Sequence, residues 1–131
     1  MVGRPRTAGG DRRRDVARRG EALAALLLRC KGYRIAARNW RCALGEVDII
    51  AWQGETLVFV EVKARRDRAL GAPEEAVTPA KRQRLVRLAQ AYLASRGGTC
   101  PPCRFDVVAV EGRVLPRVRH LRNAFRADGL V

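Results

Sequence analysis

The chain has 131 residues and a formal charge of +14, from 27 Lys and Arg against 13 Asp and Glu. This length suits one domain that buries roughly two-thirds of its unfolded surface without cross-links, and the charge favours a polyanionic partner, most simply nucleic acid. The sequence has no apolar run long enough to span a membrane and no apolar segment of a signal peptide. These observations exclude membrane and secreted classes and predict a cytoplasmic protein with no membrane partner.

The chain begins with a Gly-, Pro- and Arg-rich stretch, so residues 1–12 are predicted to be a disordered basic arm before a single domain over residues 13–131. Such an arm either adds affinity for phosphates or is a dispensable extension, and both alternatives stay open. A helix is predicted from Asp15 to Lys31, followed by Gly32 as its C-cap and a strand from Tyr33 to Trp40. The apolar stripe of this helix is predicted to contain Ala22, Leu23, Leu26, Leu27 and Cys30.

Residues 45–63 predict a β-hairpin, because two runs rich in Val and Ile flank Gly54-Glu55, which suits a type II′ turn. In that register Gln53 faces Thr56, Asp48 faces Glu61, and Glu46 faces Lys63. A three-residue loop would break this pairing. Side chains alternate along a strand, so one apolar face is predicted to contain Val47, Ile49, Ala51, Val58, Val60 and Val62.

The opposite face of the hairpin is charged at its open end, where Asp48, Glu61, Glu46 and Lys63 meet. Opposed carboxylates destabilise a sheet and raise each other's pKa unless a positive group lies between them. Mg²⁺ or Mn²⁺ would supply that charge, since Mg²⁺ is held by carboxylates, waters and substrate phosphates. The alternative is a solvated sheet end with a Glu46–Lys63 ion pair.

A polar loop is predicted from Arg65 to Val77, and a second helix begins with Thr78 as N-cap and Pro79 at its first position and ends at Gly97-Gly98. Basic residues in these two segments are candidates for binding nucleic acid, and a solvated polar surface is the alternative. They are Arg65, Arg66, Arg68, Lys81, Arg82 and Arg84.

Two strands complete the predicted chain: Arg104 to Glu111, and an edge strand from Val114 to His120 that contains Pro116. Asp106 lies on the first of them, and we expect a structural ion pair with Arg104 or another Arg. Cys100 and Cys103 form a CxxC motif. A zinc site with the other two cysteines, or a redox role, is less favoured for this motif than the absence of either function.

Asp48 followed by Glu61-Val62-Lys63 resembles the D…ExK signature of restriction-endonuclease-like nucleases, which include Holliday-junction resolvases and RecB-type nuclease domains. From Arg19 to Phe125 the chain resembles the bacterial YraN family more closely. The chain departs from the loose D…ExK signature at Val47, directly before Asp48, where that signature often has a Pro. The Pro makes no contact with the metal. The matching pieces are GE at Gly20, GY at Gly32, RN at Arg38, GEVDIIA from Gly45, VFVEVKAR from Val58, Lys81 after Pro79, RFDVV from Arg104 and NAF from Asn123.

The resemblance implies an α/β, restriction-endonuclease-like fold: a mixed central sheet with an antiparallel three-stranded meander, flanked by helices. It implies Asp48, Glu61 and Glu21 as ligands of Mg²⁺ or Mn²⁺, with Lys63 as a further catalytic residue and Lys81 reaching the site from above. The expected function is a metal-dependent endonuclease acting on nucleic acid, with DNA favoured over RNA and branched DNA included. The alternative is a non-catalytic nucleic-acid-binding protein that uses the same basic surface. A homodimer is left open.

Overall fold

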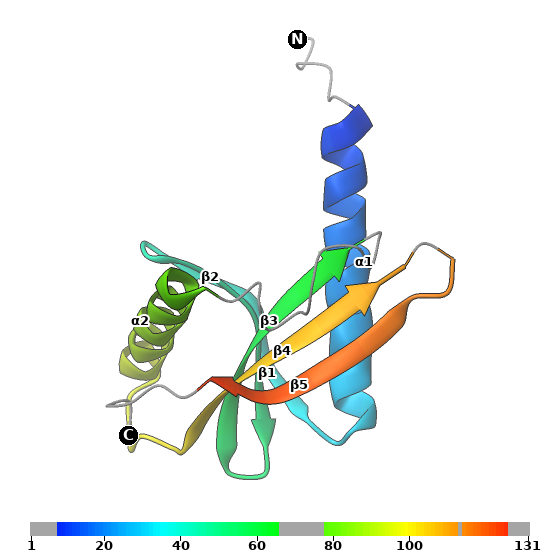
Figure 1. Cartoon of the computed structure of the whole chain (residues 1–131). Helices are drawn as coiled ribbons and strands as arrows, with labels where there is room; N and C mark the ends of the chain where they lie inside the picture. The colour runs from blue at the N-terminus through cyan, green and yellow to red at the C-terminus, as the bar shows by residue number, and fades with distance from the viewer. Residues whose placement is uncertain (1–7, 66–77, 113, 126–131) are drawn as a thin grey trace, which may run out of the picture.

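A computed structural model describes residues 8–65, 78–112 and 114–125, and side chains from residue 12 onward. Seven elements follow one another along the chain, and their order matches the predicted α/β succession (Figure 1). They are α1 (Ala8–Cys30), β1 (Arg34–Cys42), β2 (Gly45–Gln53), β3 (Thr56–Arg65), α2 (Pro79–Arg96), β4 (Cys103–Glu111) and β5 (Arg117–Phe125).

The five strands form one sheet in the order β1-β2-β3-β4-β5. The first three make an antiparallel meander, β3 and β4 run parallel, and β4 and β5 are antiparallel. The parallel pair needs a long crossover, and the connection that contains α2 supplies it. The predicted mixed central sheet with an antiparallel three-stranded meander is therefore confirmed, and it is compatible with a restriction-endonuclease-like fold.

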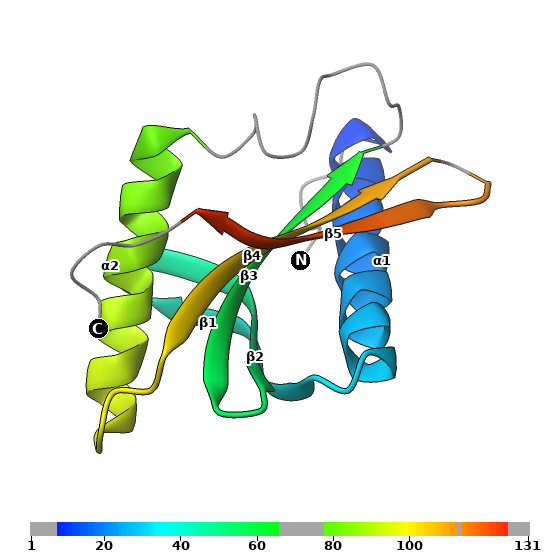
Figure 2. The same cartoon turned by 60° about the horizontal axis from the view of Figure 1, so that its bottom comes forward.

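The two helices lie on opposite faces of this sheet (Figures 1 and 2). On one face, Leu85 and Leu88 of α2 pack against a cluster that includes Phe59 of β3. On the other face, Leu28 of α1 packs with residues such as Val60. The motif hairpin is thus buried on both sides near its turn. In the described part of the chain neither helix is long and apolar enough to cross a membrane.

Helix α1 differs from its prediction in both length and orientation. It begins at Ala8, so residues 8–12 are helical rather than part of a disordered arm, and residues 1–7 lie outside the described residues. Its buried face is centred on Ala24 and Leu28, whereas Leu26 is 57% exposed and Cys30 is exposed. Gly20 accounts for the rotation, because a Cβ there would lie only 2.6 Å from the Cβ of Ala64 in β3.

The predicted hairpin register is confirmed next to the turn. Gly54 has φ 58°, while Glu55 is not among the non-glycine residues with positive φ, as a type II′ turn requires. The ladder pairs Gln53 with Thr56 and continues to Ile49–Val60. The ladder ends at that pair. The prediction that Asp48 pairs directly with Glu61, and Glu46 with Lys63, was therefore wrong. The carboxylate of Asp48 takes the place of a backbone acceptor, since the Val62 amide nitrogen donates to its Oδ2 at 2.8 Å.

The prediction that Val47 shares a face of the sheet with Ile49 was also wrong. Val47 packs in the cluster against α2, not with Ile49 on the α1 side. Its partner in the ladder, Trp40 of β1, packs against the same α2 cluster. Between Trp40 and Arg38 lies Asn39 with a left-handed φ of 52°. Regular alternation along β1 and β2 therefore stops at Asn39 and Asp48, just where the hairpin becomes charged.

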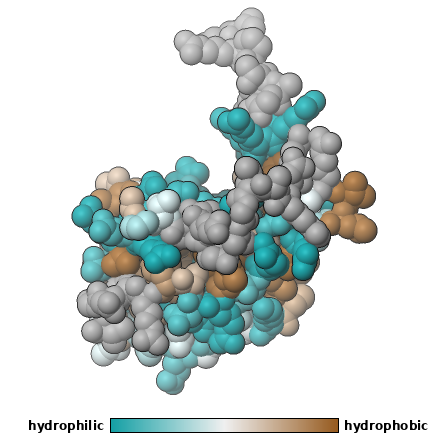
Figure 3. Space-filling model, viewed as in Figure 1, coloured by the Kyte–Doolittle hydropathy of each residue, from teal (hydrophilic) through white to brown (hydrophobic). Residues whose placement is uncertain are grey.

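Helix α2 and the last strand follow the prediction more closely. Thr78 is the N-cap of α2, accepting from the Lys81 amide nitrogen at 3.3 Å, and Gly97 is the C-cap. β5 forms an edge of the sheet, as expected, but it starts after Pro116 and extends to Phe125. Figure 3 shows a mostly hydrophilic face with an apolar patch at the end of the β4–β5 hairpin, where Val114 and Leu115 are exposed.

Candidate functional site

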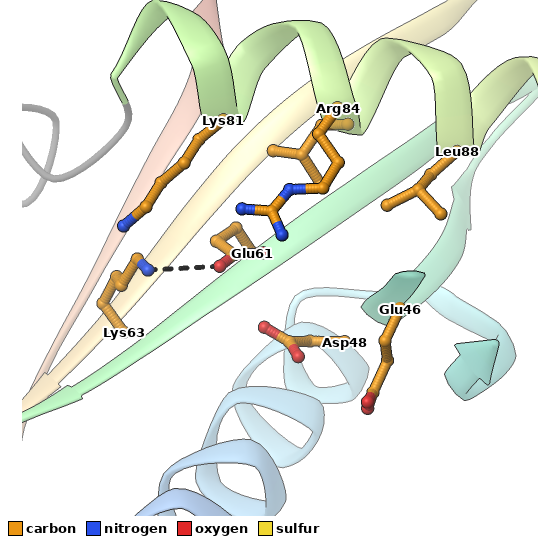
Figure 4. A pocket seen from close by; sticks show the side chains of 8 residues that line it. Glu46, Asp48, Glu61, Lys63, Lys81, Arg84 and Leu88 are labelled. Carbon is orange, nitrogen blue, oxygen red and sulfur yellow. Dashed lines mark ion pairs between the residues drawn. The ribbon is translucent and has the colours of Figure 1, made fainter. Parts of the chain in front are cut away.

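A pocket of about 240 Å³ lies between α2 and the open end of the motif hairpin. Carboxylates from β2 and β3 line one side, and Lys81 and Arg84 extend toward them from α2 (Figure 4). The predicted residues Asp48, Glu61 and Lys63 therefore meet in one place. The full lining is Glu46, Asp48, Glu61, Lys63, Lys81, Arg84, Leu85 and Leu88.

Asp48 is the most perturbed titratable group of the pocket. Burial raises the pKa of its carboxyl to about 7, and Glu61 adds to the rise. The hydrogen bond from the Val62 amide opposes it, while Glu21 and Glu46 raise the pKa further. Burial and the neighbouring carboxylates thus both disfavour the ionised form of Asp48.

Lys63 and Glu61 form an ion pair, with the Lys63 Nζ 3.2 Å from the Glu61 Oε1 (Figure 4). The ammonium of Lys63 also lowers the pKa of Lys81. Two cationic side chains thus share one side of the pocket, which suits an incoming phosphate. The Glu46–Lys63 ion pair of the alternative interpretation is absent, because Glu46 instead pairs with the Arg41 Nε at 3.2 Å.

Glu21 of α1 lies next to this site, beside Asp48, although it is not among the residues that line the pocket. Carboxylate oxygens of Glu21, Glu46 and Asp48 lie within 4.8 Å of one another, which makes the three residues a group able to hold a metal ion. With its amide oriented to suit these neighbours, the Asn39 nitrogen donates to Glu46 at 2.7 Å and to Glu21 at 3.0 Å. Sequence reasoning missed Glu46 and Asn39 as site residues. The signal for Glu46 was its position two residues before Asp48, on the same side of a strand.

Of the four residues predicted to bind nucleic acid that the structure describes, Lys81 and Arg84 line the pocket and Arg65 and Arg82 do not. The guanidinium of Arg82 instead lies 5.6 Å from the ring centroid of Phe125. Arg65 ends β3 and lines a different pocket, next to α1. Arg66 and Arg68 lie outside the described residues.

Asp106 has the structural role that the sequence predicted. Its carboxylate accepts two hydrogen bonds from Arg104, at 2.9 and 3.0 Å, one from the Asn123 backbone nitrogen at 2.9 Å, and it contacts the His120 Nε2 at 2.7 Å. Burial raises the pKa of this carboxyl, but the bonds from His120, Arg104 and Asn123 outweigh burial and leave the pKa lowered. The protein's only histidine is thus engaged away from the pocket.

The four cysteines are free thiols. Among the residues that the structure describes, they do not form a metal-binding group, since the acidic residues Glu21, Glu46 and Asp48 are the one cluster of that kind. The four-cysteine zinc site that was an alternative for Cys100 and Cys103 is therefore not formed.

Fold and site together define an α/β protein, compatible with a restriction-endonuclease-like fold, that carries D…ExK residues at the open end of its central hairpin. The chain belongs to the UPF0102, or YraN, family: the family model described as "Uncharacterised protein family UPF0102" matches residues 20–110. That match includes every residue that lines the pocket and also Glu21.

Similar proteins occur in several bacteria. A UPF0102 protein of Symbiobacterium thermophilum is 56% identical over 118 residues, which cover 87% of this chain and 98% of the relative. One from Moorella thermoacetica is 58% identical over 91 residues, covering 70% of this chain and 76% of the relative. One from Anaeromyxobacter dehalogenans is 49% identical over 121 residues, covering 92% and 90%. The family relationship thus extends over nearly the full chain.

Proposed function

We propose that this protein is a metal-dependent nuclease that hydrolyses phosphodiester bonds in nucleic acid, with DNA as the favoured substrate. The observation that carries the proposal is the meeting of Asp48, Glu61 and Lys63 in one pocket beneath the cationic side chains of α2. A solvated sheet end would not need a partly buried Asp48 with a pKa raised to about 7 beside two other carboxylates.

The donor set fits a hard divalent cation, because every candidate ligand is a carboxylate oxygen. We infer that Asp48 would hold Mg²⁺ or Mn²⁺ together with Glu21 and Glu46, whose carboxylate oxygens lie within 4.8 Å of one another and of Asp48. Glu61 is outside that group but lines the same pocket, and it would supply a further oxygen ligand. Such an ion, when bound, would polarise the scissile phosphate and lower the pKa of a coordinated water.

The basic residues of the pocket have separate roles in this proposal. Lys63, which lies 3.2 Å from Glu61, would orient the attacking water or stabilise the negative charge that develops on the phosphate. Lys81 and Arg84 of α2 face the carboxylates and would bind phosphate oxygens of the backbone. The charge of +14 would draw the polyanion toward the protein over longer distances.

A non-catalytic nucleic-acid-binding protein is the second candidate, favoured by the same basic surface. The two candidates differ in what Asp48 and Glu61 do. In the nuclease these carboxylates are needed for cleavage but not for binding, whereas in the binding protein no substrate is cleaved with any metal.

The test is a cleavage screen with Mg²⁺ and with Mn²⁺ across single-stranded, duplex, flap and four-way-junction DNA, and matching RNA. We expect cleavage of at least one DNA substrate by the wild-type protein. A Glu61→Gln variant should lose cleavage while retaining binding, and an EDTA control removes the metal. Binding without cleavage of any substrate would favour the non-catalytic candidate.

We further predict that affinity for DNA falls steeply with salt, because each phosphate neutralised by Lys or Arg releases condensed counterions. If about six phosphates are contacted, affinity should fall roughly 10³-fold between 50 and 200 mM salt. Fluorescence anisotropy with a labelled duplex measures this slope. The double variant Lys81→Ala/Arg84→Ala should flatten it, and a salt-independent affinity would remove the basic surface from the proposal.

A further inference from the structure

Asn39 occupies an unusual position across the sheet from Asp48. The β1–β2 ladder pairs Arg38 with Ile49 and Trp40 with Val47, so Asn39 and Asp48 are the residues between these two pairs. The φ of Asn39 is 52°, in the left-handed region, which few residues other than Gly and Asn adopt readily. In Asn39 this conformation inside a strand accompanies side-chain contacts with two other elements.

The side chain of Asn39 connects two carboxylates from different elements. Its amide nitrogen donates to Glu46 Oε1 on β2 at 2.7 Å and to Glu21 Oε2 on α1 at 3.0 Å. An amide nitrogen carries two hydrogens, so it can serve both acceptors at once, and it adds no charge. Each carboxylate oxygen has further lone pairs, and the second oxygen of Glu21 is not used by Asn39.

Without a donor between them, the carboxylates of Glu21 and Glu46 would repel each other and move apart. Both have an oxygen within 4.8 Å of a carboxylate oxygen of Asp48. A charged donor such as Lys in place of Asn39 would offset one of the group's negative charges and compete with a cation. An Asp would add a further negative charge, and a hydroxyl would reach only one of the two glutamates.

We infer that Asn39 is a positioning residue for the cation site, which holds Glu21 and Glu46 as preset oxygen ligands beside Asp48. This inference rests on the proposed function, because that function supplies the divalent cation. In this role Asn39 does not touch the substrate or the ion. It acts through the two glutamates, as the hydrogen-bond partners of metal ligands commonly do.

The test compares Mn²⁺ affinity in the wild-type protein and in an Asn39→Gly variant, measured as loss of the free-ion signal in electron paramagnetic resonance. Gly adopts the same left-handed backbone without strain, so the substitution removes only the amide. We expect affinity to fall by about 10- to 100-fold, the usual effect of removing a partner of metal ligands. Asn123→Gly is the matched control, because Asn123 has φ 53° on β5 and should leave Mn²⁺ affinity unchanged.

A double-variant cycle separates positioning from a general loss of structure. In a Glu46→Ala background, where one of the two glutamates is already gone, Asn39→Gly should reduce Mn²⁺ affinity by a smaller factor than in the wild type. Equal factors in both backgrounds would overturn the inference. Asn39→Ser keeps one donor, so its Mn²⁺ affinity should lie between those of the wild type and Asn39→Gly. If the glycine variant does not fold, Asn39→Ser should still bind Mn²⁺ more weakly than the wild type, and equal affinity would overturn the inference.

Two outcomes distinguish failure of the inference from failure of the function. If the wild type binds Mn²⁺ and Asn39→Gly binds it equally well, Asn39 is not a positioning residue and the proposed nuclease site is unaffected. If the wild type does not bind Mn²⁺, both the metal site of the proposed function and the inference are overturned.

Discussion

Replacing Asp48 by Asn should stabilise the metal-free protein at pH 8 and abolish its stabilisation by Mn²⁺. The asparagine side-chain oxygen can still accept the hydrogen bond from Val62, so the main change is the loss of a charge that is largely buried and lies beside Glu61, Glu21 and Glu46. The pKa of Asp48 is raised from 3.8 to about 7. That shift corresponds to about 4 kcal/mol at most, and solvent screening reduces it, so we expect a gain on the order of 2 kcal/mol.

The pH dependence of this effect has a definite sign. Because the pKa is raised, the folded state holds the Asp48 proton more tightly than the unfolded state between about pH 4 and 7. The wild-type free energy of unfolding therefore falls as pH rises through that window and is level above it. The Asn variant lacks this contribution, so the stability difference between the two proteins should grow from pH 5 to 7 and then remain constant.

Thermal melts with and without Mn²⁺ measure both parts of the prediction. Mn²⁺ stabilises only a native state that binds it, so the wild type should gain stability and the Asn variant should not. Cleavage should vanish in the variant while DNA binding persists. A structural Asp48 would behave differently: its loss would cost roughly 1–3 kcal/mol at every pH, with or without metal. That result would contradict the proposed site.

The central hairpin could be predicted because its determinants are local. Gly54 selects the turn, and the turn selects the register as far as Ile49–Val60. The same reasoning failed beyond that point because it continued the strand alternation to Gly45. The conformation of Asn39, which interrupts the alternation, accompanies contacts with Glu46 and with Glu21 on α1. A contact between distant elements leaves no periodic signal in the sequence.

The orientation of α1 escaped prediction for a similar reason. Residues 22–28 are apolar nearly all around the helix, so periodicity alone did not select the buried face. The selection comes from the close approach of Gly20 to Ala64, which fixes the face that meets β3. The candidate site residues Asp48, Glu61 and Lys63 could be predicted because they have the spacing of the D…ExK signature. Glu46 was visible in the sequence but was assigned to the wrong partner.

Asp48 and Asp106 make the same kind of hydrogen bond but lie in different electrostatic surroundings. Each carboxylate accepts a backbone N–H where regular strand pairing is interrupted, from Val62 and from Asn123 respectively. Their surroundings then differ in charge. Burial raises the pKa of both carboxyls. At Asp48 neighbouring carboxylates, Glu61 first, add to that rise, whereas at Asp106 the hydrogen bonds from His120 and Arg104 outweigh burial and leave the pKa lowered. The same substitution should therefore have opposite effects at the two positions.

Asp106→Asn should destabilise the protein strongly. The Asp106 side chain is fully buried and that of His120 is 1% exposed, so the amide would leave Arg104 and His120 without their charged acceptor. Removing one partner of a buried ion pair costs about 3–5 kcal/mol, and we expect at least about 3 kcal/mol, or a fall in Tm of roughly 10 °C.

The effect of Asp106→Asn should also weaken in acid. Because the pKa of Asp106 is lowered, its contribution to wild-type stability is present above about pH 4 and is lost as pH falls toward its folded-state pKa. Urea unfolding at pH 7 and at pH 3.5 measures this convergence, and Mn²⁺ should stabilise the variant as much as the wild type, since Asp106 lies outside the pocket. A variant as stable as the wild type at pH 7 would show that the Arg104–Asp106–His120 contacts contribute little to the fold. A loss of Mn²⁺ stabilisation in a folded Asp106→Asn protein would instead mean that this carboxylate acts on the metal site, contrary to the structural role assigned to it.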